Sequence, residues 1–111
     1  MHYQALLMLA VAIAFELLGT TALKLSDGGA KPLWYVPVGM GYTAAFYFFS
    51  LALKEIPLGV SYAIWAGVGI VGTAIIGKFL FQQTLTPLAM AGIGLILLGA
   101  VLVNLGPGSA H

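Results

Sequence analysis

One carboxyl group lies inside a long apolar stretch of this sequence, where it can hold a proton or a cation but not both at once. Glu16 is the only acid within any of the four apolar stretches of the chain. Placing a charged side chain at the centre of a bilayer costs about 3 kcal/mol on insertion scales, so such a residue is a functional candidate by default. The alternative is a structural role, in which a protonated Glu16 bonds to a neighbouring helix.

Small side chains accompany this acid at helical spacing. Leu9, Ala12, Glu16, Gly19 and Leu23 recur every three or four positions, which places them on one face of a helix. Small residues let a second helix approach closely. The pattern therefore favours a packed site around Glu16, although alanine and glycine are also common in membrane helices for other reasons.

Aromatic residues at other positions could attract an organic cation. Tyr62 and Trp65 are three residues apart and share a helix face, and Tyr42 belongs to the preceding apolar stretch. A cation over an aromatic face gains about 2 kcal/mol when the pair is desolvated. An aromatic belt at the membrane surface is the competing interpretation, and it suits Tyr3 and Trp34 better than Trp65, which is well inside its stretch.

Glycines mark two further features. The segment Gly67-Val68-Gly69 falls in the middle of the third stretch, where paired glycines weaken a helix and allow a hinge. Gly92 and Gly99 are seven residues apart in the fourth stretch, a spacing that suits close packing between subunits. Packing within a single subunit is the alternative for the second pair.

The elements that must position these residues are predicted by composition. Of 111 residues, 61% are hydrophobic and only 6% are charged, far below the charged fraction of about a quarter in soluble domains. A membrane-spanning helix needs about 20 apolar residues, so the length fits four spans with short loops. An all-α integral membrane protein with one four-helix domain is expected over residues 1–111, with helices at about 3–23, 33–53, 58–81 and 87–105.

Breaks between these stretches carry the usual helix-ending residues. Ser26-Asp27-Gly28-Gly29 is a turn signal, Pro57 and Pro87 stand where helices begin, and Thr86 is placed to cap the fourth helix. Loops this short make consecutive helices antiparallel neighbours. Lys24, Lys31 and Lys78 belong to one side and Lys54 with the N-terminal amine to the other. This three-to-two bias is too small for the positive-inside rule to choose an orientation, so insertion both ways up is possible.

Several function classes have little support. A net charge of +1 without a basic run argues against a nucleic-acid partner, and the absence of cysteine excludes disulfides and thiolate metal sites. The sequence has no metal-ligand spacing, no phosphate-binding loop and no nucleophile paired with a base. We therefore expect neither an enzyme nor a bound cofactor.

These features together resemble the small multidrug resistance transporters over almost the whole chain, from Leu9 to about Leu105. The residues that carry the resemblance are Leu9, Ala12, Ile13, Glu16, Gly19 and Thr20, then Lys24, Tyr42, Ile56-Pro57, Tyr62-Ala63-Ile64-Trp65, Gly67-Val68-Gly69, Gly92 and Gly99. The resemblance implies an antiparallel, dual-topology homodimer in the bacterial inner membrane. It also implies export of small organic cations in exchange for protons.

The resemblance assigns a role to each matching position. It makes Glu16 the proton- and substrate-binding acid and Tyr42, Tyr62 and Trp65 the aromatic substrate-binding residues, with Gly67 and Gly69 as a hinge. The implied site lining consists of Leu9, Ala12, Ile13, Gly19 and Thr20, and the implied dimer contact of Gly92 and Gly99. Gly19-Thr20 after the acid is typical of the exporters of quaternary cations.

Two positions depart from the family pattern. Leu6 stands ten residues before the acid, where the drug exporters often have an aromatic residue, and Lys78 stands where an aromatic residue is common. Export of a defined metabolite, such as guanidinium, a polyamine or a compatible solute, is therefore an alternative function. A non-transporting, proton-relaying membrane subunit is a second alternative, and an obligate heterodimer with a related chain is a third.

Overall fold

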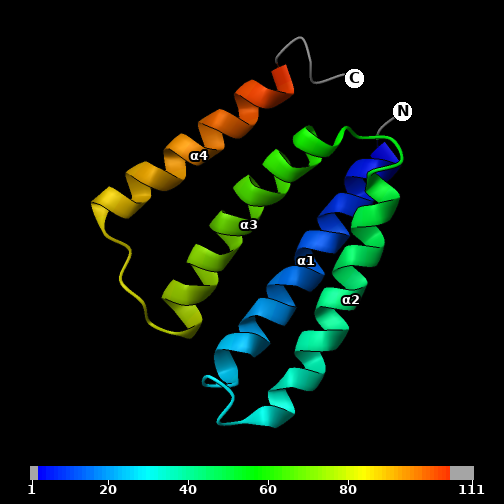
Figure 1. The fold of residues 1–111 in the computed structure, drawn as a ribbon. Coiled ribbons are helices and arrows are strands. Elements are labelled where there is room, and N and C mark those ends of the chain that lie inside the picture. The colour runs from blue at the N-terminus through cyan, green and yellow to red at the C-terminus, as the bar shows by residue number, and fades with distance from the viewer. Residues whose placement is uncertain (1–2, 106–111) are drawn as a thin grey trace. The chain divides into compact units, whose positions relative to one another are not determined.

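The computed structural model describes residues 3–105 and divides the chain into two helical units, residues 3–55 and 56–105. Each unit consists of two long helices joined by a short connection (Figure 1). The first unit contains α1 (Tyr3–Leu25), a short 3-10 helix η1 (Pro32–Trp34) and α2 (Tyr35–Ala52). The second contains α3 (Leu58–Leu80) and α4 (Pro87–Leu105). The prediction of four helices is confirmed, and four of its eight boundaries differ from the structure by one or two residues.

Local sequence explains where the first unit turns. Asp27, Gly28 and Gly29 all have positive φ values, of 54°, 66° and 94°, so the predicted turn forms where two glycines can adopt this backbone without strain. The second helix was expected from residue 33, but η1 comes first and α2 begins at Tyr35. Pro32 provides no backbone N–H, and the tighter 3-10 turn leads into α2.

The helix starts of the second unit follow their prolines. Pro57 precedes α3 and its carbonyl accepts a hydrogen bond from the Ser61 N–H at 2.9 Å. Pro87 is the first residue of α4, and the Thr86 hydroxyl accepts a hydrogen bond from the Ala89 N–H at 3.1 Å. The predicted cap by Thr86 is therefore confirmed.

Three of the four helices are long and apolar enough to cross a membrane by length and composition, namely α1, α3 and α4. The remaining helix, α2, has 18 residues and no charged residue, but its tyrosines, glycines, serine and threonine lower its hydropathy. Its length is about 27 Å at 1.5 Å per residue, close to the hydrocarbon thickness of about 30 Å. The chain is a multi-pass helical membrane protein.

Packing is closest in the first unit. Helices α1 and α2 lie side by side in antiparallel directions (Figure 1). Their buried side chains are mostly small, so the two backbones approach each other closely. These buried residues include Ala5, Ala12 and Ala22 on α1 and Ala45 and Ala52 on α2.

Candidate functional site

A chain of two hydrogen bonds joins Glu16 to the second helix. The Thr20 hydroxyl donates to Glu16 Oε2 at 2.5 Å, one helical turn away on α1. The same hydroxyl lies 2.7 Å from the hydroxyl of Tyr42 on α2. Because Thr20 has one hydroxyl hydrogen and directs it to the carboxylate, Tyr42 is the donor to Thr20. The chain therefore runs from Tyr42 through Thr20 to the carboxylate of Glu16.

Two glycines bring these groups together. A side chain at Gly41 would place its Cβ 2.9 Å from the backbone N of Gly19 and from the carbonyl oxygen of Phe15, so only glycine fits this contact. A Cβ at Gly19 would lie 3.2 Å from the ring of Tyr42. This close approach of α1 and α2 sets the rotation that points the Tyr42 hydroxyl at Thr20. One face of the site is therefore built by backbone contact.

An aromatic pair supports the same helix contact. The rings of Phe15 and Phe48 stack with centroids 5.8 Å apart and planes within 2°. Stacked aromatic pairs add about 0.5–1.5 kcal/mol beyond the area they bury. Phe15 directly precedes Glu16 and Phe48 directly follows Tyr47, so the pair joins α1 to α2 beside the acid.

The remaining residues expected around Glu16 are divided between the core and its edge. Leu9, Ala12, Ile13 and Gly19 are buried, whereas Glu16 and Thr20 are half-buried. Leu23, expected on the same face, is 42% exposed. The predicted face therefore exists from Leu9 to Thr20, and its lining role stays a prediction.

The other aromatic candidates belong to the second unit. Tyr62 is exposed on α3, and Trp65, one turn further along, is half-buried. The structure brings Tyr42 to the carboxylate site within the first unit, and it describes Tyr62 and Trp65 within the second.

The predicted hinge segment is helical throughout. Helix α3 continues without a break from Leu58 to Leu80 through Gly67 and Gly69, both of which are buried. A Cβ at Gly67 would lie 3.4 Å from Ala100 and from Leu97 of α4, which is ordinary contact distance. Gly67 therefore faces α4, and the role of the two glycines as a hinge stays a prediction.

The fourth helix presents a free surface in this chain. Within residues 3–105, α4 has no buried residue, and a Cβ at Gly92 or Gly99 would meet nothing within 4 Å. The space beside these two glycines is therefore unoccupied by the described residues, and a contact with another subunit requires such space.

Sequence reasoning did not single out Gly41, the Phe15–Phe48 pair or the hydrogen bond between Thr20 and Tyr42. The four-residue spacing of Glu16 and Thr20 was a usable signal, because such residues are neighbours on a helix. Gly41 directly precedes Tyr42, but nothing in that dipeptide indicates which helix it contacts. Among the residues that the structure describes, no group of three or more His, Cys, Asp or Glu side chains could hold a metal ion.

Comparison with known proteins gives a consistent result. The family model for the Small Multidrug Resistance protein matches residues 2–96. The chain is 44% identical to a multidrug transporter of Pseudomonas aeruginosa over 99 residues, which cover 89% of this chain and 90% of that protein. It is 45% identical to the quaternary ammonium compound-resistance protein QacE of Escherichia coli over 106 residues, covering 95% of this chain and 96% of QacE.

A third relative extends the range of organisms. The multidrug resistance protein EbrA of Bacillus licheniformis is 47% identical over 97 residues, covering 87% of this chain and 92% of EbrA. The family and these relatives are transporters, not enzymes. The chain therefore belongs to the small multidrug resistance family of membrane transporters.

Proposed function

We propose that this protein is a proton-coupled antiporter that exports hydrophobic and quaternary-ammonium-type cations, with protons and substrate competing for Glu16. The observation that carries this proposal is the half-buried Glu16 carboxylate, which accepts a hydrogen bond from Thr20 beside the aromatic ring of Tyr42. The names of its relatives, among them a multidrug transporter and a quaternary ammonium compound-resistance protein, support this substrate class.

Competition for one negative charge is sufficient for exchange. A protonated Glu16 has no charge to offer a cation, and a cation on the carboxylate excludes the proton. On the proton-rich side of the membrane, proton uptake releases the substrate. On the other side, loss of the proton restores affinity for the next cation.

Aromatic side chains provide the selectivity for organic cations. Tyr42 lies next to the carboxylate site, and its ring can face a cation that has lost its water shell. Tyr62 and Trp65 on α3 are proposed to complete the aromatic surface. Such a surface attracts weakly hydrated cations without demanding one shape, which suits a broad substrate range.

A second copy completes the transporter in this proposal. The open surface of α4 around Gly92 and Gly99 supports a dimer contact through this helix. An antiparallel homodimer in the bacterial inner membrane would bring two Glu16 side chains to one shared site. Exchange of conformations between the subunits, with Gly67 and Gly69 as the hinge, would expose that site to each side in turn.

Transport in proteoliposomes tests this function. Purified protein is reconstituted with a pH gradient, and uptake of tetraphenylphosphonium is followed together with proton flux. The wild type and the control Glu55→Gln, whose acid lies in the connection after α2, should exchange cations for protons. Glu16→Gln should not, and exchange by this variant would contradict the proposal.

Substrate and partner alternatives give different results in the same assay. Exchange with guanidinium but not with tetraphenylphosphonium would make the protein a metabolite exporter. Proton flux that no cation affects would indicate a proton-relaying subunit. Activity only after a related chain is added would indicate a heterodimer. Two relatives of this chain, EbrA and EbrB, come from the same organism, Bacillus licheniformis, as a pair of related chains requires.

A further inference from the structure

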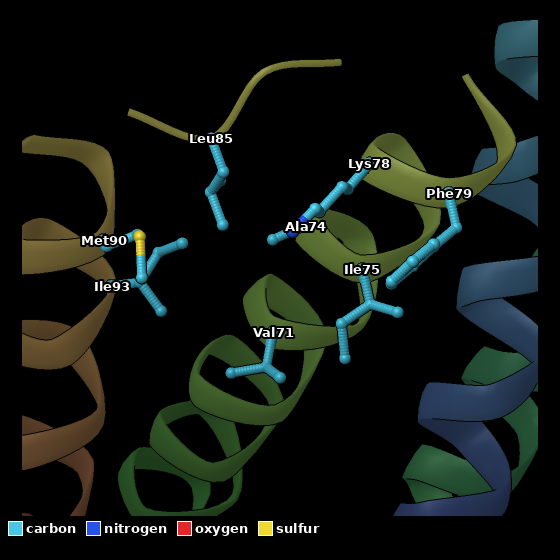
Figure 2. A pocket seen from close by; sticks show the side chains of 8 residues that line it. All are labelled: Val71, Ala74, Ile75, Lys78, Phe79, Leu85, Met90 and Ile93. Atoms are coloured by element: carbon cyan, nitrogen blue, oxygen red, sulfur yellow. The ribbon is translucent and has the colours of Figure 1, made fainter. Parts of the chain in front are cut away.

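We infer that the second unit carries a binding site for an anionic phospholipid between α3 and α4, with Lys78 as its phosphate-binding residue. The site starts from a cavity of about 300 Å³ whose lining is apolar except for Lys78. Figure 2 shows Lys78 extending from α3 into the space that Leu85 and Met90 face from the other side. The other lining residues are Val71, Ala74, Ile75, Phe79 and Ile93.

The cavity beside Lys78 has an apolar end and continues into a polar end. A second cavity, of about 460 Å³, shares Lys78, Leu85 and Met90 with the first. Its remaining lining is polar and consists of Gln82, Gln83 and Thr84 in the connection before α4. The two cavities together offer apolar walls for an acyl chain and hydrogen-bonding groups for a headgroup.

The connection that forms the polar end is held in place by backbone contacts. The Gln83 N–H donates to the Gly77 carbonyl at 2.9 Å. A Cβ at Gly77 would lie 2.5 Å from the Gln83 side-chain oxygen, so the Gln83 side chain packs directly over Gly77 and would have to shift for a larger residue there. Gln82 has a positive φ of 55°, which folds the connection back toward the end of α3. The polar wall next to Lys78 is therefore built into the fold.

The positive charge of Lys78 indicates which kind of lipid the site binds. Lys78 is the only charged residue in the sequence from 56 to 105, so no carboxylate in that segment competes with an anion for its ammonium group. It lies in the last turn of a candidate membrane span, the depth at which lysines reach toward lipid headgroups. Basic pockets between membrane helices at this depth suit phosphate headgroups. Apolar walls beside this ammonium group fit an acyl chain next to a headgroup of net negative charge, which describes an anionic phospholipid rather than a zwitterionic lipid or a soluble anion.

Native mass spectrometry of the full-length protein tests this site. The protein is titrated with phosphatidylglycerol and, separately, with phosphatidylcholine of the same acyl chains. One lysine near the membrane surface contributes about fivefold in affinity for an anionic lipid. The wild type should prefer phosphatidylglycerol by at least about this factor. Lys78→Gln should lose the preference, Lys78→Arg should keep it, and the control Lys54→Gln in the connection after α2 should not change it.

Two further measurements in the same experiment identify the ligand. Ile93→Trp fills the apolar end without changing charge, and it should weaken binding of both lipids. Glycerol phosphate, which lacks acyl chains, should not displace the lipid. The inference is overturned if Lys78→Gln still prefers phosphatidylglycerol, or if Lys54→Gln loses this preference to the same extent. Displacement of the lipid by glycerol phosphate would also overturn it. So would a Lys78→Gln variant in which the number of protein copies changes and the bound lipid does not.

Discussion

The hydroxyl of Tyr42 lies 2.7 Å from the Thr20 hydroxyl, which itself donates to Glu16. A residue of α2 thereby acts on the carboxylate through a residue of α1. The position of the carboxylate consequently depends on the contact between the two helices, and a change in that contact alters how Glu16 meets its ligands.

Removing the Thr20 hydroxyl should weaken cation binding. In Thr20→Val the side chain keeps its shape, but the ionised Glu16 loses a hydrogen bond of the kind worth about 1.5–3 kcal/mol. Affinity for tetraphenylphosphonium at fixed pH, measured by calorimetry, should fall by about tenfold or more. Thr21→Val removes a hydroxyl that bonds to the Leu17 carbonyl and should have little effect. Equal losses in the two variants would contradict a specific role for Thr20.

Removing the Tyr42 hydroxyl should have a smaller effect of the same sign. Tyr42→Phe keeps the aromatic ring for the cation and deletes only the donor to Thr20, a neutral hydrogen bond worth about 1 kcal/mol. We expect about a threefold loss of cation affinity, and no further loss when the change is combined with Thr20→Val. Tyr47→Phe on the exposed side of α2 is the matched control. Fully additive effects of Thr20→Val and Tyr42→Phe would show that the two hydroxyls act separately.

Gly41→Ala should destabilise the first unit. Its Cβ would lie 2.9 Å from backbone atoms of Phe15 and Gly19, and backbone cannot move aside as a flexible side chain can. Overpacking of this kind costs about 1–3 kcal/mol. The melting temperature in detergent should fall, whereas Gly39→Ala, whose Cβ meets nothing within 4 Å, should leave it unchanged or raise it. A Gly41→Ala protein as stable as the wild type would contradict the close contact of α1 and α2.

Ser61→Ala should not reduce stability. Ser61 is fully buried, and its hydroxyl has no hydrogen-bond partner among the described residues. An unsatisfied buried hydroxyl costs about 1–3 kcal/mol, so its removal should raise the melting temperature or leave it unchanged. Ser50→Ala, which removes an exposed hydroxyl that bonds to the Tyr47 carbonyl, provides the comparison. A clear loss of stability in Ser61→Ala alone would reveal a partner for this hydroxyl.

The four helices could be predicted from the sequence because their ends are marked by charge, proline and glycine. The turn at Asp27-Gly28-Gly29 and the cap at Thr86 follow from local chemistry that a few residues determine. The residue at which α2 begins was harder to predict, because the choice between a 3-10 turn and an α-helix after Pro32 depends on small energy differences.

The site was only partly predictable for a different reason. The cost of a carboxylate in an apolar stretch identifies Glu16 from sequence alone. Its connection to Tyr42 depends on how α1 and α2 are rotated, which the contact at Gly41 determines. Helical periodicity gives the faces of each helix but not the partner that each face meets. The hollow beside Lys78 likewise requires the folded connection of residues 81–86.

Proton release on cation binding tests the central claim most directly. Tetraphenylphosphonium, and separately guanidinium, is added to purified protein in weakly buffered detergent while the pH is recorded, with Glu16→Gln as the control. Competition at Glu16 predicts release of protons with tetraphenylphosphonium and none in the variant. Cation binding without proton release in the wild type, or equal release from Glu16→Gln, would contradict it.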